Sequence, residues 1–455
     1  MHFPEALISS LRGLKGFDEQ AFLSAHKCAP PVSVRLNPRK AAGMEANDLF
    51  MVSGKVPWTG YGYYLAERPS FTIDPLLHAG AYYVQEASSM FLEFLMKNLP
   101  LDAGPKTILD LCAAPGGKST LLHGVMGDDD LLVSNEVIKT RASILVENLT
   151  KWGAPNAVTT NNDPKDFQNL GEFFDVIVVD APCSGSGLFR KDAQAINEWS
   201  TANVEHCCQR QERILEDILP ALKTGGYLVY STCSYSPLEN ENVLDHLSEK
   251  HKMQGVDFAV NDDWNIVTTS TPGGNTGFRF YPDKLQGEGF FIGVMHKMEP
   301  VENKAYGKIR KPFEQPSKIE KEMAAALMND SDKYAFIAVN EEVIALPGMH
   351  KENIQFIRDN LYVKKAGIVV GQASAKEFVP DHVLALSGLL HKDFPRVEAT
   401  LEEAREYLRK NDPRIGTGIR GRAAVTYKNL PLGFAKFLPG RMNNCYPTAW
   451  RIINK

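Results

Sequence analysis

Two cysteines lie just past the ends of strand-like runs, and their thiols are the side chains of this sequence best suited to covalent chemistry. Cys183 follows Phe174-Asp-Val-Ile-Val-Val179, and Cys233 follows Gly226-Tyr-Leu-Val-Tyr230. Runs rich in β-branched and aromatic residues are typical of buried strands. A structural thiol normally lies inside such a strand, whereas ligands of α/β proteins bind beyond the strand ends. Asp180 adds a carboxylate there. The pair of thiols therefore predicts a reactive site.

A loop of small residues, Cys112-Ala-Ala-Pro-Gly-Gly-Lys118, follows a predicted strand and opens a predicted helix. Small residues let a ligand approach the backbone amides at a helix N-terminus. A Walker A loop needs glycine where Cys112 stands, and the dinucleotide fingerprint G-x-G-x-x-G is absent. An adenosyl ligand without a pyrophosphate remains, and S-adenosylmethionine is the commonest of these. Lys118 is then either a neighbour of the methionine carboxylate or a solvated first-turn lysine.

Acidic residues close three successive predicted strands above this loop: Glu136, Asp163 and Asp180. Glu136 lies 20 residues past Gly116 (136 − 116), the spacing at which an acid accepts hydrogen bonds from ribose hydroxyls. Each acid alone is more often a helix N-cap or a loop residue than a ligand. Their repetition at one edge of a sheet favours the cofactor site.

Strands and helices alternate through the middle of the chain, as they do in a doubly wound parallel sheet. The predicted strands are 107–111, 131–135, 157–160, 174–179 and 226–230, and the predicted helices include 82–99, 138–152 and 193–222. Two further strands, 277–281 and 289–295, have no helix between them and predict a closing antiparallel hairpin. Beyond the linker, strands are predicted at 334–339, 362–363 and 367–370 and a helix at 398–409.

Residues after the second cysteine are expected to hold its turn. Ser236-Pro-Leu-Glu239 matches a capping box with proline at the first helical position. Asn240 and Asn242 are candidates for further support of this loop, with ordinary surface positions as the alternative. Arg35, in the N-terminal region, is either a phosphate contact or an ordinary surface arginine.

The charge is distributed unevenly along an otherwise ordinary globular composition. The 455 residues suggest two or three domains, and the net charge of −5 gives no overall nucleic-acid signal. Residues 301–455, however, contain 25 Lys and Arg against 18 Asp and Glu, and no acidic residue follows Asp412. The basic residues past that point are Arg414, Arg420, Arg422, Lys428, Lys436, Arg441, Arg451 and Lys455, and the aromatic ones include Tyr427, Phe434, Phe437, Tyr446 and Trp450. This asymmetry predicts a module that binds a polyanion, with a solvated basic face as the alternative.

The cysteine pattern and the start of the sequence bear on metal content and location. Seven cysteines show no C-x-x-C spacing and no Cys/His cluster typical of zinc, so we expect free thiols and no metal site. Cys207-Cys208 beside His206 lies in a predicted helix and is expected to be buried packing. Met1-His-Phe-Pro-Glu lacks the features of a signal peptide, and no apolar run approaches the ~20 residues of a membrane span. We therefore expect a cytoplasmic protein, a monomer, without a membrane partner.

Three motifs, in this order, resemble those of the S-adenosylmethionine-dependent RNA cytosine-5 methyltransferases of the Nop/Sun type. They are Leu-Cys-Ala-Ala-Pro-Gly-Gly-Lys118, Val-Asp-Ala-Pro-Cys183-Ser-Gly and Ser-Thr-Cys233-Ser with Glu239-Asn-Glu-Asn. The likeness covers about residues 30–298. Segments within 376–447 resemble the C-terminal PUA-like module of the bacterial RsmF branch, which modifies small-subunit (16S) ribosomal RNA. Met442-Asn-Asn-Cys445 departs from the basic run common in that branch.

The resemblance implies a class I methyltransferase of the α/β class: a Rossmann-like, mostly parallel sheet with a closing antiparallel hairpin, a small N-terminal domain and a C-terminal α+β PUA-like module. Its domains are then an accessory RNA-binding domain at 1–75, a catalytic domain at 76–298, a linker at 299–320, a connecting region at 321–365 and an RNA-binding module at 366–455. The expected partners are S-adenosylmethionine, which leaves as S-adenosylhomocysteine, and ribosomal RNA or the small ribosomal subunit.

The resemblance also assigns roles within the site. Cys233 is the expected nucleophile, Cys183 serves product release or acts as the base, and Asp180 orients the target base. The expected cofactor contacts are Cys112, Ala113, Ala114, Pro115, Gly116, Gly117, Lys118, Glu136, Asp163 and Asp180. Arg141 resembles the family's basic residue in the second helix. Alternatives are a transfer RNA cytosine-5 methyltransferase and a ribosome assembly factor that binds RNA without catalysis. DNA cytosine-5 enzymes lack the second Thr-Cys site, and amino-directed enzymes carry an Asn-Pro-Pro-Tyr type of tetrad that is absent here.

Overall fold

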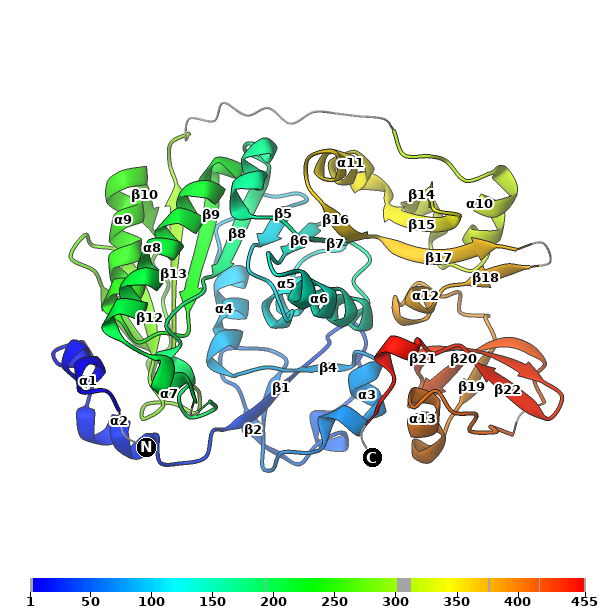
Figure 1. Cartoon of the computed structure of the whole chain (residues 1–455), viewed down its shortest axis with the longest axis horizontal. Helices are drawn as coiled ribbons and strands as arrows, with labels where there is room; N and C mark the ends of the chain where they lie inside the picture. Colours follow the sequence, from blue (N-terminus) through cyan, green and yellow to red (C-terminus); the bar gives the residue numbers. More distant parts are fainter. Residues whose placement is uncertain (1–2, 193, 301–311, 375–376, 417, 454–455) are drawn as a thin grey trace.

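A ten-stranded mixed sheet forms the centre of the molecule. The computed structural model describes residues 3–192, 194–300, 312–374, 377–416 and 418–453. The central sheet has the order β11-β12-β13-β9-β8-β5-β6-β7-β16, and β10 also pairs with β13 (Figure 1). Its parallel strands are β5 (Thr107–Asp110), β6 (Leu131–Asn135), β7 (Ala157–Thr160), β8 (Phe174–Asp180) and β9 (Leu222–Thr232). The antiparallel strands are β10 (Met253–Gly255), β11 (Val267–Ser270), β12 (Thr276–Phe280), β13 (Phe290–Lys297) and β16 (Val363–Ala366). The predicted parallel sheet and its closing hairpin, β12–β13, are confirmed.

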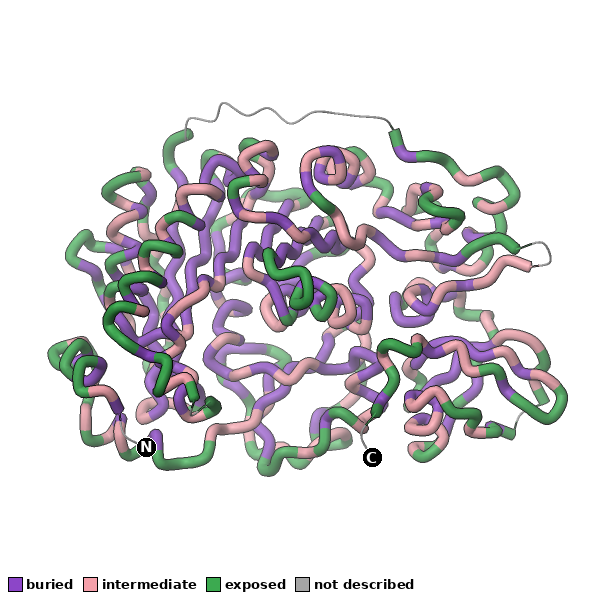
Figure 2. The backbone as a smooth tube through the Cα atoms, in the orientation of Figure 1, coloured by how far each residue is buried: buried purple, intermediate pink, exposed green. Residues whose placement is uncertain are grey.

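Helices cover both faces of this sheet because its strands alternate apolar residues between them. Ile108 and Val178 point into one core, which includes residues of α4 (Phe91–Asn98), α5 (Gly117–Val125) and α6 (Lys139–Trp152). Leu109 and Val179, their sequence neighbours, point into a second core with α8 (Thr201–Ile218), α9 (Glu241–His251) and α11 (Lys351–Asn360). Residues buried on both faces of a sheet are expected for parallel strands covered by helices. Figure 2 shows the central strands as mostly buried backbone.

The N-terminal region contributes a four-stranded antiparallel sheet in the order β2-β3-β1-β4. Its elements are α1 (Glu5–Leu11), α2 (Glu19–Ala25), β1 (Val32–Leu36), β2 (Val52–Lys55), β3 (Gly62–Leu65), α3 (Pro75–His78) and β4 (Tyr82–Val84). The predicted helix over 82–99 is therefore wrong in its first part, since Tyr82–Val84 pairs with β1 and only α4 is α-helical. Arg35 is neither a phosphate contact nor a surface residue: it is 2% exposed and donates to Gln85 Oε1 (2.8 Å) and Thr120 Oγ1 (2.7 Å). It thereby ties β1 to the helix of the glycine loop.

The predicted helix over 193–222 is two helices in the structure. They are α7 (Gln194–Glu198) and α8, and Ser200 caps α8 by accepting a hydrogen bond from the amide of Asn203. An N-cap residue has non-helical backbone angles, so the predicted single helix is interrupted at Ser200. The first residue of the prediction, Ala193, lies outside the described residues, and its last, Leu222, already belongs to β9.

Two further four-stranded sheets follow the strands of the central sheet in sequence, apart from β16. The first has the order β14-β15-β17-β18 and the second β19-β20-β21-β22. Their elements are α10 (Lys318–Ala325), β14 (Tyr334–Val339), β15 (Glu342–Pro347), β17 (Ile368–Ala373), β18 (Phe378–Pro380), α12 (His382–Leu386), β19 (Arg396–Glu398), α13 (Leu401–Leu408), β20 (Gly421–Tyr427), β21 (Leu430–Leu438) and β22 (Arg441–Asn444). Residues 301–311 of the predicted linker lie outside the described residues, and α10 begins within its last part. Of the helices described, none is both long and apolar enough to cross a bilayer.

One strand between β15 and β17 in sequence returns to the central sheet. β16 pairs antiparallel with β7, so it extends the central sheet at that edge. The next strand, β17, instead pairs with β15 and β18. The predicted boundary between residues 365 and 366 falls inside β16. The chain therefore passes within a few residues, from β16 to β17, out of the central sheet and into the sheet of β15 and β18.

Candidate active site

The two predicted thiols lie side by side. Because β8 and β9 are parallel neighbours in register at Asp180 and Ser231, the residues that follow them leave the sheet at the same edge. The sulfur atoms of Cys183 and Cys233 are 3.1 Å apart, and either can donate the shared hydrogen bond. This contact with Cys233, together with burial, raises the pKa of the Cys183 thiol well above its usual value. The Cys183 thiol is therefore protonated at neutral pH.

The carboxylate of Asp180 lies beside the thiols at the end of β8. Its Oδ1 accepts a hydrogen bond from Ser231 Oγ (2.8 Å), and its Oδ2 lies 2.7 Å from Lys118 Nζ. Burial by itself would lower the pKa of the Lys118 ammonium, but the carboxylate of Asp180 outweighs it and raises that pKa. Lys118 is thus not a solvated first-turn lysine: its side chain is 12% exposed and neutralises Asp180.

A cavity of about 180 Å³ adjoins this pair. It is lined by Tyr83, Val84, Gln85, Glu86, Ser89, Cys112, Ala113, Ala114, Pro115, Gly117, Lys118 and Asp180. Gly116 has φ of 119°, which only glycine adopts readily, and it is the N-cap of α5. Two carboxylates and one ammonium line the space, so a ligand with a positively charged sulfonium fits its charge. The small side chains of the loop leave its backbone open to that ligand.

Helix α6 holds the glycine loop from outside. Arg141 donates to the carbonyl of Ala114 (2.6 Å), and Asn148 donates to that of Pro115 (2.7 Å). Arg141 also lies 3.3 Å from Glu136, whose other oxygen accepts from the amide of Ile138 (2.9 Å). The predicted basic residue of the second helix thus connects the loop to the buried acid at the end of β6.

Three of the predicted cofactor residues are not among those lining the cavity: Gly116, Glu136 and Asp163. Asp163 accepts a hydrogen bond from the amide of Lys165 in a capping box completed by Asp166, the ordinary role considered for a lone acid. Cys112 does line the cavity, and burial raises the pKa of its thiol. A protonated, buried thiol is a packing group rather than a second nucleophile.

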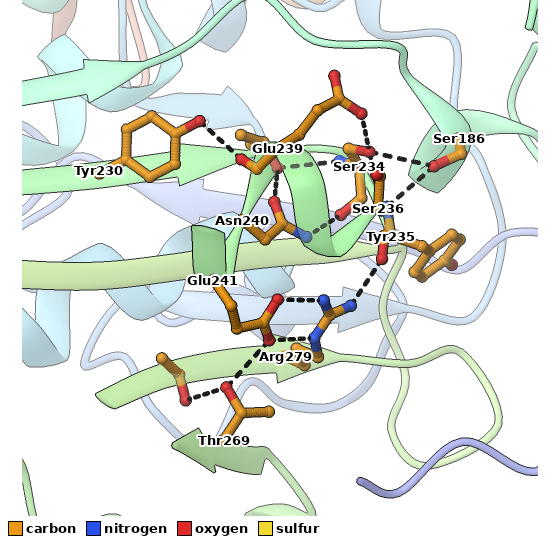
Figure 3. Close-up of polar contacts among 12 residues, drawn as sticks. Ser186, Tyr230, Ser234, Tyr235, Ser236, Glu239, Asn240, Glu241, Thr269 and Arg279 are labelled. Atoms are coloured by element: carbon orange, nitrogen blue, oxygen red, sulfur yellow. Dashed lines mark hydrogen bonds and ion pairs between the residues drawn. The ribbon is translucent and has the colours of Figure 1, made fainter. Parts of the chain in front are cut away.

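The contacts of Glu239 differ from the sequence prediction, which made this residue part of a capping box. The predicted capping box requires Ser236 to bond the start of the helix, but its side chain makes no such bond. The carboxylate of Glu239 points instead toward the two loops that carry Cys183 and Cys233, the thiol loops. It accepts a hydrogen bond from Ser234 (Figure 3) and two from Ser184. The sequence feature that could have indicated these contacts is the serine that directly follows each cysteine. Asn240 supports the Cys233 turn as expected, because it donates to the carbonyl of Ser234 (2.8 Å).

Other groups considered for chemistry lie apart from the thiols. Cys207 is buried in α8, as expected, and Cys208 is half-buried. Within the described chain, one set of side chains has metal-ligand spacing: Glu216, His246 and His251, whose ligand atoms lie within 4.8 Å of one another. They belong to α8 and α9 and line neither the 180 Å³ cavity nor its larger neighbour of about 640 Å³.

The basic C-terminal residues divide into paired and unpaired groups. Arg422 and Lys436 both contact Glu377. Arg414, Arg420, Lys428, Arg441 and Arg451 are exposed and form no ion pair with any residue that the structure describes. Among the aromatic residues of this region, Phe434, Phe437 and Tyr446 are buried, and Tyr427 and Trp450 are half-buried. The exposed cations are thus the candidates for contact with a polyanion, and most of the rings are core.

Three family models match successive parts of the chain. The model of 16S rRNA methyltransferase RsmB/F matches residues 100–296. The models of the N-terminal domain of 16S rRNA methyltransferase RsmF and of the methyltransferase RsmF PUA domain match residues 3–87 and 394–452.

Curated relatives match along nearly the whole length. The ribosomal RNA small subunit methyltransferase F of Vibrio parahaemolyticus is 30% identical over 98% of this chain and 97% of its own. That of Aliivibrio fischeri strain MJ11 is 32% identical over 86% of this chain and 84% of its own.

Solved structures share the fold. A methyltransferase homologue from Pyrococcus horikoshii is 28% identical, with a TM-score of 0.51 over 65% of this chain and 99% of that one. NSun6 from Pyrococcus horikoshii with SFG is 19% identical, with a TM-score of 0.53 over 65% of this chain and 99% of that one, and it shows the fold alone.

Proposed function

Because the chain belongs to the family of ribosomal RNA small subunit methyltransferases F, we propose that it transfers a methyl group from S-adenosylmethionine to carbon 5 of a cytosine in small-subunit ribosomal RNA. The observation that carries this proposal is the 3.1 Å contact between the sulfurs of Cys183 and Cys233, at the sheet edge that also holds the glycine-loop cavity. We further propose that the enzyme acts as a monomer in the cytoplasm.

Carbon 5 of cytosine is too weak a nucleophile to accept the methyl group directly, so the mechanism uses covalent catalysis. The thiolate of Cys233 forms a bond to carbon 6, and the electron pair of the 5,6 double bond moves to carbon 5. When bound, S-adenosylmethionine supplies an electrophilic methyl group to that carbon. Water takes the carbon 5 proton, and the electron pair of that C–H bond forms the 5,6 double bond again. The pair of the bond between sulfur and carbon 6 leaves with the sulfur of Cys233, which restores the aromatic system.

The neighbouring residues have distinct tasks in this scheme. The target base must leave its stack to reach the site, and the carboxylate of Asp180 then accepts hydrogen bonds from its exocyclic amine and from its protonated ring nitrogen. Lys118 and Ser231 fix that carboxylate in place. Cys183 keeps its proton because its pKa is raised, which suits a thiol that protonates the departing sulfur of Cys233. The loop from Cys112 to Lys118 would hold the methyl donor, and Glu136, which pairs with Arg141 behind the loop, would complete that site.

Trapping of a covalent RNA–protein adduct tests the proposal. The Cys183→Ala variant should accumulate the adduct, and the Cys233→Ala variant should form none. Both are compared with the wild-type chain for incorporation of labelled methyl groups into RNA. If wild type incorporates no methyl label and neither variant forms an adduct, the chain is an RNA-binding protein without this activity.

The nature of the RNA is tested separately. Bisulfite mapping after reaction with total RNA should place the new 5-methylcytosine in small-subunit ribosomal RNA. If the modified position lies in transfer RNA, the proposed substrate is wrong and the proposed cytosine-5 methyl transfer still holds. Comparison of naked RNA with assembled small subunits then identifies the form that the enzyme accepts.

A further inference from the structure

One carboxylate connects the two thiol loops. Glu239 is fully buried, and its Oε1 accepts a hydrogen bond from the amide of Ser184 (2.7 Å). Its Oε2 accepts from the hydroxyls of Ser184 (2.6 Å) and Ser234 (2.5 Å). Ser184 directly follows Cys183, and Ser234 directly follows Cys233. The side chain of Glu239 therefore holds the residue next to each sulfur.

This carboxylate has no cationic partner among the described residues. Its fourth donor is Gln211 of α8, whose Nε2 lies 3.4 Å from Glu239 Oε1 and also donates to the carbonyl of Pro182 (3.0 Å). Burial raises the pKa of Glu239, and the hydrogen bonds from Ser184 and Ser234 act in the opposite direction. A buried acid without a counter-ion is costly. Four donors around one carboxylate make it a rigid, directional connection.

The turn of Cys233 has a second, independent support. Asn240 accepts from the hydroxyl of Thr232 (2.6 Å) and donates to the carbonyl of Ser234 (2.8 Å), so it binds the residues on both sides of Cys233 (Figure 3). Arg279 adds a hydrogen bond to the carbonyl of Tyr235 (2.8 Å). On the other side of the site, Ser184 donates two of the hydrogen bonds that Glu239 accepts. Loss of Glu239 should therefore displace Cys183 more than Cys233.

We propose that Glu239 is a positioning residue that holds Cys183 against the sulfur of Cys233, and that Asn240 separately positions Cys233. This inference rests on the function proposed above. It predicts that the two residues control different stages of the reaction. Asn240 controls addition of Cys233 to the base, whereas Glu239 controls the later stage at which Cys183 helps to release the product.

The ratio of adduct to product separates these roles. The Glu239→Ala variant should release methylated RNA on the order of 10- to 100-fold more slowly than wild type, because a displacement of about 1 Å has an effect of that size. It should accumulate the covalent adduct, as Cys183→Ala does. The Asn240→Ala variant should form less adduct. Ser236→Ala is the matched control, because the Ser236 side chain makes no cap hydrogen bond and should leave turnover at the wild-type level.

The distance between the thiols is measured without any reaction on RNA. Treatment of the full chain with diamide oxidises two adjacent thiols to a disulfide and is itself reduced to a hydrazine. Mass spectrometry of the digested protein should find the Cys183–Cys233 bridge quickly in wild type and Ser236→Ala. In Glu239→Ala the bridge should form several-fold more slowly. If the bridge forms in this variant at the wild-type rate, the inference is wrong, regardless of the result of the RNA methylation assay.

The milder variant Glu239→Gln keeps the test valid if Glu239→Ala does not fold. The NH2 group of the glutamine replaces one of the two accepting oxygens, so it faces either the backbone amide of Ser184 or the two serine hydroxyls. The same changes in release and adduct are therefore expected, but smaller. Folded variants, identified by thermal unfolding, that lose turnover without accumulating adduct contradict the assignment. If wild type makes no methylated RNA and Cys183→Ala makes no adduct, the proposed function fails, and the diamide result still decides whether Glu239 positions Cys183.

Discussion

Replacement of Gly187 by alanine should disable the active site by displacing the backbone of Cys233. A Cβ added at Gly187 would lie 2.3 Å from the carbonyl oxygen of Gly289 and 2.7 Å from that of Cys233. These distances fall short of the 3.4 Å at which ordinary contact begins by 1.1 and 0.7 Å. Both atoms belong to the backbone, so no side chain can rotate away. The amide of Gly187 also donates to the carbonyl of Cys233 (2.8 Å), and a shift would strain that bond.

The expected sizes follow from these overlaps. A nucleophile displaced by about 1 Å reacts about 100-fold more slowly, which corresponds to about 2.7 kcal/mol in the barrier. Overpacking should also lower the free energy of unfolding by about 1–3 kcal/mol. Single-turnover methyl transfer with saturating cofactor measures the first quantity, and urea unfolding measures the second.

A matched glycine provides the control. A Cβ at Gly54, in β2, would lie 3.9 Å from the ring of Tyr64, so Gly54→Ala should change neither quantity appreciably. If Gly187→Ala reacts within about threefold of wild type, equivalent to about 0.7 kcal/mol, the carbonyl of Cys233 does not set the position of its sulfur.

Three further predictions concern stability and RNA binding. Arg279 and Glu241 form a buried ion pair, so Glu241→Gln should lower the free energy of unfolding in urea by about 3–5 kcal/mol; the loss should be smaller when Arg279 is also replaced by Met, and equal losses would contradict the pairing. Burial lowers the pKa of His382 to about 3, below its value of about 6.5 in an unfolded chain. The unfolded state then binds more protons, so stability is complete above about pH 6.5 and falls by up to about 1.4 kcal/mol per pH unit as pH is lowered from there; urea unfolding of His382→Phe should depend less on pH, and an unchanged slope would show that this ring is not buried neutral. Arg420 precedes β20, and Arg441 opposite Leu438 lies at the same end of that sheet. Replacing both by Ala should reduce the slope of log affinity for RNA against log salt by about 0.7–0.9 per residue, and parallel salt titrations would contradict this RNA contact.

Local sequence was sufficient for the central strands and for the position of the thiols. The residues of β6 and β7 are the predicted ones, and β5 and β8 differ by one residue at one end. Their β-branched and apolar residues favour strands in any environment, and parallel neighbours place their carboxyl ends at one edge. A cysteine that follows such a strand closely is therefore placed at the site by the strand itself. The glycine loop is equally local, since its small residues and the following helix are contiguous.

Tertiary structure decided the elements whose partners are distant in sequence. Tyr82–Val84 is compatible with helix or strand, and it is a strand because β1, some fifty residues earlier in the N-terminal sheet, offers unpaired backbone groups. β16 joins the catalytic sheet because the edge of β7 is available to it. Neither partner can be identified from the segment alone, because a short strand is stabilised by the hydrogen bonds of its neighbour.

The same distinction holds within the active site. The sequence was sufficient to predict which residues carry the chemistry, because thiols, a carboxylate and a glycine loop have fixed chemical properties. It could not determine what Glu239 binds, because a buried carboxylate accepts hydrogen bonds from whatever donors the fold brings to it. Ser184 lies 55 residues away in sequence and donates twice. Whether Glu239 caps its own helix or holds the two thiol loops depends on desolvation and on how the segments of Ser184, Ser234 and Glu239 lie relative to one another. That arrangement exists only in the folded chain.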